Sequence, residues 1–144
     1  MLAMPAGSWR GYALIWALLL SMPALSGQAP ETIVGATVVS AEELIDLVTK
    51  RADVVLIDAR LAGDYLRGHI DGAINLPNTE TNCHTLVGII PQRSTPLVFY
   101  CNGETCLRSA KSVRIARSCG YVGVYWFRGG FAEWLTKGYP YLKK

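Results

Sequence analysis

The sequence lacks several features that mark common classes of protein. Its 144 residues include only two histidines and carry a net charge of +3, and the basic residues are scattered along the chain. Weak, scattered positive charge argues against a surface that binds nucleic acid. The cysteines have no histidine partners at zinc-ligand spacing, which argues against a metal site. Without repeats or low-complexity tracts, we expect one globular domain with no cofactor and no metal.

Charge is also absent from a long stretch near the N-terminus, and this stretch has the form of a secretory signal. Arg10 precedes an apolar run from Tyr12 to Leu20, and Ala24-Leu25-Ser26 has the small-x-small pattern of a cleavage site. This predicts a signal peptide over residues 1–26 and a short linker over residues 27–35. We therefore expect an exported protein of the bacterial periplasm.

A retained membrane anchor is the alternative interpretation of this stretch. The uncharged run from Gly11 to Gln28 approaches the minimum length of a membrane span. Ser21, Pro23 and Ser26 weaken its second half, so cleavage is favoured. Contact with the membrane is then expected only through the signal segment, if it is left uncleaved.

Export changes the interpretation of the four cysteines, because disulfides persist in oxidising compartments. Cys83, Cys101, Cys106 and Cys119 allow three complete pairings, and the sequence alone does not choose among them. Cys83 and Cys119 are interpreted as structural residues, either as free thiols of the core or as a pair.

Apolar segments of two kinds alternate along the rest of the chain. Short runs without polar alternation indicate buried strands, and apolar residues at helical spacing indicate helices with one wet face. Ser40 and Glu43 also form a capping box at a helix start. Such alternation implies a mainly parallel sheet with helices on both faces. The expected strands are 36–39, 54–57, 73–76, 97–100 and 122–127, and the expected helices are 41–51, 62–67, 85–90, 108–118 and 131–137.

The segment from Pro96 to Ala116 is the chemical centre of the chain. A buried strand over 97–100 is followed by Cys101 in a compact loop, and a helix begins near Arg108. Backbone N–H groups and the positive end of the helix dipole face such a loop, so they favour a thiolate. We interpret Cys101 as a nucleophile, with a buried structural thiol as the alternative.

Several ordered motifs together resemble the signatures of one family, the rhodanese-like sulfurtransferases. The first motif is Asp58-Ala59-Arg60 followed by the run from Asp64 to Pro77. The segment from Leu97 to Cys101 is similar to the active-site strand and its cysteine. The run from Arg128 to Trp134, with Gly138-Tyr139-Pro140, is similar to the C-terminal signature. One short motif would mean little, whereas three in the right order form a specific signal.

The resemblance covers residues 36–142 and implies a three-layer α/β/α domain with a five-stranded, mainly parallel sheet. It implies that Cys101 accepts a sulfane sulfur from a donor such as thiosulfate and holds it as a persulfide. The sulfur then passes to a thiophilic acceptor, either a small anion or a thiol, and a periplasmic protein partner is also expected. The loop residues expected to bind the substrate and persulfide are Asn102, Gly103, Glu104, Thr105, Cys106, Leu107 and Arg108, whose amides supply preformed donors.

The loop departs from the family pattern in its length. Arg108 lies seven positions after Cys101, about two more than usual, and the spacing also differs from that of phosphatases with the same fold. The insertion contains Cys106, which is interpreted as a resolving cysteine, as half of a structural disulfide or as an inert thiol. Two alternative functions follow: a thiol–disulfide redox or sulfur-relay protein, and a non-catalytic binding module.

The remaining candidate residues each have two interpretations. Asp58 and Arg60 either shape the electrostatics of the site or form a buried ion pair, and the ion pair is favoured. Arg108 is either a cation for an anionic donor or a solvated helix residue. Glu104 is compatible with an anionic donor only if it points to solvent. His69 is interpreted as a packed turn residue, and the aromatic residues Tyr100, Tyr125, Trp126 and Trp134 as core.

Overall fold

The computed structural model describes residues 1–3 and 28–144 of the chain. Apart from its first three residues, the predicted signal peptide lies outside this description. Within the described residues, no helix has both the length and the apolar character needed to cross a bilayer. The elements are β1 (Ala36–Val38), α1 (Ala41–Lys50), β2 (Val55–Asp58), α2 (Ala62–Arg67), β3 (Ile74–Asn75), α3 (Cys83–Ile89), β4 (Leu97–Tyr100), α4 (Leu107–Ser118), β5 (Val124–Phe127) and α5 (Gly130–Thr136).

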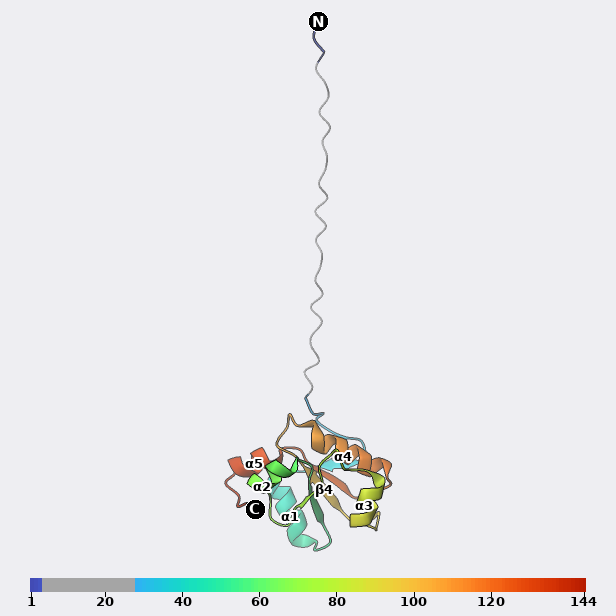
Figure 1. The fold of residues 1–144 in the computed structure, drawn as a ribbon, viewed down its shortest axis with the longest axis vertical. Coiled ribbons are helices and arrows are strands. Elements are labelled where there is room, and N and C mark those ends of the chain that lie inside the picture. Colours follow the sequence, from blue (N-terminus) through green and yellow to red (C-terminus); the bar gives the residue numbers. More distant parts are fainter. Residues whose placement is uncertain (4–27) are drawn as a thin grey trace.

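The five strands form one sheet in the order β1-β5-β4-β2-β3 (Figure 1). All four strand pairs are parallel, which confirms the α/β class and the five-stranded sheet. Asp58 pairs with Tyr100 in register, and Tyr100 pairs with Phe127. The carboxyl ends of the three central strands therefore meet at one edge, where binding groups collect in open α/β sheets.

Helices cover both faces of this sheet, as Figure 1 shows: α3 and α4 lie on one side and α1, α2 and α5 on the other. Strand β4 contributes alternate side chains to the two cores. Leu97 and Phe99 join the cluster under α3 and α4, and Val98 and Tyr100 join the cluster under α1 and α5. All four are completely buried. A strand covered on both faces needs continuous apolar residues, which explains its lack of polar alternation.

The segment predicted as a linker packs against the domain. Ala29 and Ile33 are buried within the core under α3 and α4. The Arg128 Nε–H also donates to the Pro30 carbonyl oxygen at 2.8 Å. Ala29 and Ile33 do not form a periodic apolar pattern, so no local signal predicted this contact.

Helix boundaries follow the capping chemistry of the chain. The expected capping box of α1 is present: the Glu43 N–H donates to Ser40 Oγ, and Glu43 Oε2 accepts from the Ser40 N–H. Helix α3 begins at Cys83, two residues earlier than expected. The reason is a second capping box, in which Asn82 and Thr85 satisfy each other's backbone N–H groups.

A disulfide joins Cys83, the first residue of α3, to Cys119, the C-cap of α4, with a Cα–Cα distance of 5.3 Å. The two cysteines were expected to be structural, and the pair is the form that the structure shows. The bond ties two helices on the same face of the sheet, 36 residues apart in the chain. It therefore restricts the unfolded chain and favours the packed arrangement of α3 and α4.

Candidate active site

Cys101 lies directly after β4, at the carboxyl edge of the sheet, and only 1% of its surface is exposed. Its carbonyl oxygen accepts a hydrogen bond from the Phe131 N–H at 2.9 Å. The next carbonyl, of Asn102, accepts from the Ala132 N–H at 2.7 Å. In a trans peptide group the C=O and N–H bonds point in opposite directions. The two carbonyl groups face α5, so the N–H groups of residues 102 and 103, which belong to the same peptide groups, point away from α5. The first turn of α5 thus fixes the start of the loop.

Gly130 permits this close contact between the loop and α5. Its φ angle is +58°, and a β-carbon at this position would collide with the Cys101 carbonyl oxygen. A side chain would therefore be opposed twice, by the left-handed backbone and by the loop itself. The glycine pair of the C-terminal motif has a geometric role at the site.

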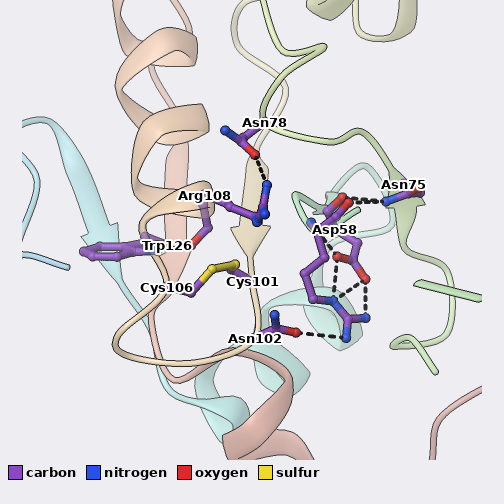
Figure 2. Close-up of a disulfide and its surroundings, with 10 residues drawn as sticks. Asp58, Asn75, Asn78, Cys101, Asn102, Cys106, Arg108 and Trp126 are labelled. Atoms are coloured by element: carbon purple, nitrogen blue, oxygen red, sulfur yellow. Dashed lines mark hydrogen bonds and ion pairs between the residues drawn. A yellow bond between two sulfur atoms is a disulfide. The ribbon is translucent and has the colours of Figure 1, made fainter. Parts of the chain in front are cut away.

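Cys106 closes the loop by a disulfide to Cys101, with a Cα–Cα distance of 6.2 Å (Figure 2). Its N–H donates to the Gly103 carbonyl oxygen at 3.0 Å, which forms a tight turn inside the loop. The bond is one of the pairings that the sequence left open. In this state both sulfurs are bonded to each other, so a thiolate at Cys101 is available only after reduction.

Helix α4 begins one residue earlier than expected, at Leu107, with Cys106 as its N-cap. Ser109, in the first turn, accepts a hydrogen bond from the Trp126 Nε1–H at 2.9 Å. Because both residues are buried, this bond fixes the start of α4 against β5. The positive end of the helix dipole therefore lies at the loop that holds the two sulfurs.

The two charged side chains of the loop region point in different directions. Arg108 Nη1–H donates to Asn78 Oδ1 at 3.1 Å, and Figure 2 shows it extending from α4 toward Asn78. Glu104 has a side chain that is 70% exposed, and it forms an ion pair with Arg128 at 3.2 Å. The acidic group is thus directed to solvent, which is the arrangement compatible with an anionic donor.

Asp58 and Arg60 form a buried ion pair, the interpretation that the sequence favoured. Arg60 Nε lies 2.9 and 3.1 Å from the two Asp58 oxygens, and Nη2 lies 2.6 Å from Oδ2. Burial would lower the pKa of Arg60, but hydrogen bonds from its guanidinium to Asp58 raise it overall, so the cation persists. Burial and the Asp58 charge raise the pKa of Tyr100, whose hydroxyl therefore stays protonated and donates to Asp58 at 2.6 Å.

The ion pair also touches the loop. Arg60 Nη1 lies 3.5 Å from Asn102 Oδ1, and its guanidinium carbon lies 4.4 Å from the centre of the Phe131 ring. Asn75 Nδ2 donates to the Arg60 carbonyl oxygen at 2.9 Å, from β3 (Figure 2). These contacts place Arg60 beside Asn102, the residue that follows Cys101. Asp58 and Arg60 accordingly support the loop through Asn102 and do not contact the sulfurs themselves.

His69 is buried, and its ring is engaged in local structure. Its Nδ1 lies 2.9 Å from the Tyr65 carbonyl oxygen, and its ring stacks on the Tyr65 ring at 3.8 Å. This agrees with its interpretation as a packed turn residue. Of the aromatic residues interpreted as core, Tyr100, Trp126 and Trp134 belong to the two buried apolar clusters. Tyr125 is partly buried and packs against one of these clusters.

Sequence reasoning missed three residues that shape the site: Asn75, Asn78 and Gly130. The two asparagines lie at or just after the end of β3, and they hydrogen-bond the Asp58–Arg60 segment and Arg108 respectively. Their position in the sequence could have identified them, since polar residues at the carboxyl end of a parallel strand face the site. The contact of Gly130 with the loop joins distant segments and had no local signal.

Three comparisons describe the relatives of this chain. The sequence model of the rhodanese-like domain family matches residues 40–137. The mouse thiosulfate sulfurtransferase/rhodanese-like domain-containing protein 3 is 31% identical over 109 residues, which cover 68% of each chain. The HTH-type transcriptional regulator Rv0324 of Mycobacterium tuberculosis is 38% identical over 88 residues, and the chain spans 37% of that regulator's length. The human single-domain sulfurtransferase TSTD1 superposes with a TM-score of 0.59 at 30% identity, over 71% of this chain and 97% of that one.

Proposed function

The chain belongs to the rhodanese-like domain family, and we propose that it is a sulfurtransferase whose sulfur carrier is Cys101. The observation that carries this proposal is the position of Cys101, directly after the central strand and beside the N-terminus of α4. Two relatives support it, because their names describe sulfurtransferases: the mouse protein and human TSTD1.

The proposed transfer has two steps and begins from the reduced loop. The Cys101 thiolate attacks the outer sulfur of a donor such as thiosulfate, a sulfur–sulfur bond forms, and sulfite leaves with the electron pair of the broken bond. A thiophilic acceptor then takes the outer sulfur and returns Cys101 to the thiolate. Backbone N–H groups of the loop and the N-terminus of α4 stabilise the negative charge in both states.

Arg108 is the cation proposed to bind the anionic donor. It lies in the first turn of α4, two residues after Cys106, and Asn78 holds its guanidinium at 3.1 Å. The outward position of Glu104, paired with Arg128, keeps its negative charge away from the donor. Asn102 to Leu107 form the rest of the proposed binding loop, with Asp58 and Arg60 as its support.

A thiocyanate assay tests the proposal directly. The protein is reduced first, then mixed with thiosulfate and cyanide, and thiocyanate is measured over time. We expect the Cys101→Ser variant to fall to the rate without protein, while the matched Cys106→Ser variant keeps turnover. Thiocyanate formation by Cys101→Ser at the wild-type rate would overturn the proposal. Failure of both wild type and Cys106→Ser to form thiocyanate, although folded, would instead favour thiol–disulfide redox chemistry or a non-catalytic binding module.

A second candidate function is thiol–disulfide redox chemistry without sulfur transfer. The disulfide between Cys101 and Cys106 favours it, because both sulfurs lie in one short loop. This candidate predicts that neither wild type nor Cys106→Ser forms thiocyanate, and that Cys106→Ser loses thiol–disulfide exchange. The sulfurtransferase proposal predicts that thiocyanate formation persists in that variant.

We also propose that the protein functions after export, in the periplasm, with a protein partner there. The predicted signal peptide supports this, together with the pairing of all four cysteines in disulfides. Fractionation of cells that express the full chain tests the location. We expect periplasmic protein that begins near Gly27, and a cytoplasmic protein that retains Met1 would contradict it.

A further inference from the structure

Cys101 and Cys106 lie in one loop, within reach of each other, but differ in their exposure to solvent. Their sulfurs are within bonding reach while the loop keeps its contacts with α5 and its turn at Gly103 (Figure 2). Cys101 is 1% exposed, whereas Cys106 is half-buried. The buried sulfur is therefore already beside an internal thiol, while an external acceptor has to reach it through the loop.

We propose that Cys106 is a resolving cysteine that releases the sulfur held on Cys101 as sulfide, which makes the protein a dithiol-dependent sulfane-sulfur reductase. This inference rests on the proposed function, since it begins from the Cys101 persulfide. The Cys106 thiolate attacks the Cys101 sulfur, and the Cys101–Cys106 disulfide forms. The bond to the outer sulfur breaks, and that sulfur leaves as hydrosulfide with the electron pair. The outer sulfur is reduced and the two cysteines are oxidised.

The start of α4 favours this attack. Cys106 is the N-cap of a twelve-residue helix, so the helix dipole stabilises its thiolate, which is the attacking species. The attack is also intramolecular, and a well-oriented intramolecular group has an effective concentration of about 10⁵ M or more. No conformational search is needed, because the disulfide of the product is the arrangement that the structure shows.

An external dithiol completes the cycle. It attacks the more exposed sulfur, that of Cys106, and the buried Cys101 leaves as the thiolate that accepts the next sulfur. A second attack by the dithiol on the mixed disulfide frees Cys106 and oxidises the dithiol. With thiosulfate as donor, each cycle consumes one thiosulfate and one dithiol and yields one sulfite, one sulfide and one disulfide. The disulfide form itself accepts no sulfur, so continued turnover requires a dithiol.

A single-turnover experiment on the full chain tests this role. Wild type, Cys106→Ser and Cys101→Ser are reduced with dithiothreitol, freed of reductant under anaerobic conditions and mixed with one equivalent of thiosulfate. Sulfite, sulfide and intact mass are then measured, and the modified peptide is identified. Without reductant present, sulfide arises only from a thiol of the protein.

We expect wild type to release one sulfite and one sulfide and to end with the Cys101–Cys106 disulfide. Cys106→Ser should release sulfite alone and keep one added sulfur on Cys101, and Cys101→Ser should release neither. Wild type that keeps its persulfide, with no sulfide released, would overturn the resolving role while leaving the sulfurtransferase proposal intact. Failure of Cys106→Ser to gain sulfur, although folded by circular dichroism, would instead overturn the proposed function.

Discussion

Arg60 and Asp58 form an ion pair in which both side chains are almost fully buried, 3% and 0% exposed, with Nη2 and Oδ2 2.6 Å apart. Removing one member of such a pair leaves an uncompensated charge in the protein interior. The pair lies at the carboxyl end of β2 and reaches Asn102, the residue after Cys101. Stability and the position of the loop are therefore linked through it.

Asp58→Asn should lower the free energy of unfolding by about 3 to 5 kcal/mol, because Arg60 stays charged and loses its partner. Urea denaturation measures this value. The matched control is Asp53→Asn, which breaks the exposed pair of Asp53 with Arg51. Exposed pairs contribute little to stability. Equal effects of the two substitutions would contradict the role given to burial.

Gly130→Ala should impair sulfur transfer by about a hundredfold, because the new methyl group displaces the Cys101 carbonyl and misplaces the nucleophile. The thiocyanate assay measures the loss in a Cys106→Ser background, where the resolving thiol does not compete with cyanide. Gly72→Ala is a suitable control: Gly72 also has a positive φ, of +78°, but a β-carbon there has no heavy atom within 4 Å. Both variants should lose stability, and only Gly130→Ala should lose transfer. Comparable losses of transfer would show that backbone strain, not the contact with the loop, is responsible.

Replacing both Cys83 and Cys119 by Ala should lower the free energy of unfolding by about 3 to 4 kcal/mol, since the disulfide closes a loop of 36 residues. Sulfur transfer should persist, because α3 and the C-cap of α4 lie away from the Cys101 loop. Denaturation with and without a reductant provides the measurement. Wild type and the double variant should become equally stable once the wild-type disulfide is reduced.

Glu42 makes the stability of the fold depend on pH in the acid range. Hydrogen bonds from Lys137 and Tyr139 lower the pKa of Glu42 from 4.5 to about 2. A lowered pKa in the folded state means that the carboxylate stabilises the fold above about pH 4.5, and that this contribution is lost as the pH falls toward 2. Glu42→Gln should therefore flatten the fall in Tm between pH 4.5 and 2. A parallel fall in both proteins would contradict the assignment to Glu42.

Much of the fold was predictable because it is determined by local patterns. The buried run Leu97–Tyr100 and the capping box of Ser40 and Glu43 gave the central strand and the first helix nearly to the residue. The start of α3 was missed because Asn82 and Thr85 form a less familiar capping box than the serine–glutamate form. The burial of Ala29 and Ile33 depends on distant partners, so no local signal marked it.

The site was predictable where its residues follow one another in the chain. Cys101, Cys106 and Arg108 were identified from one loop and its helix, and their catalytic and binding roles stay predictions. The pairing of Cys101 with Cys106 was one of three possibilities and required the fold. The contact of Gly130 with the Cys101 carbonyl brings together two segments that are far apart in sequence, and only tertiary structure shows it.

The most direct test of the central claim is the intact mass of the reduced Cys106→Ser protein before and after incubation with thiosulfate. In this variant the resolving thiol is absent, so the persulfide should accumulate. We expect a gain of one sulfur atom, located on the Cys101 peptide and removed by cyanide with formation of thiocyanate. An unchanged mass in folded protein, or a sulfur located on another residue, would contradict Cys101 as the sulfur carrier.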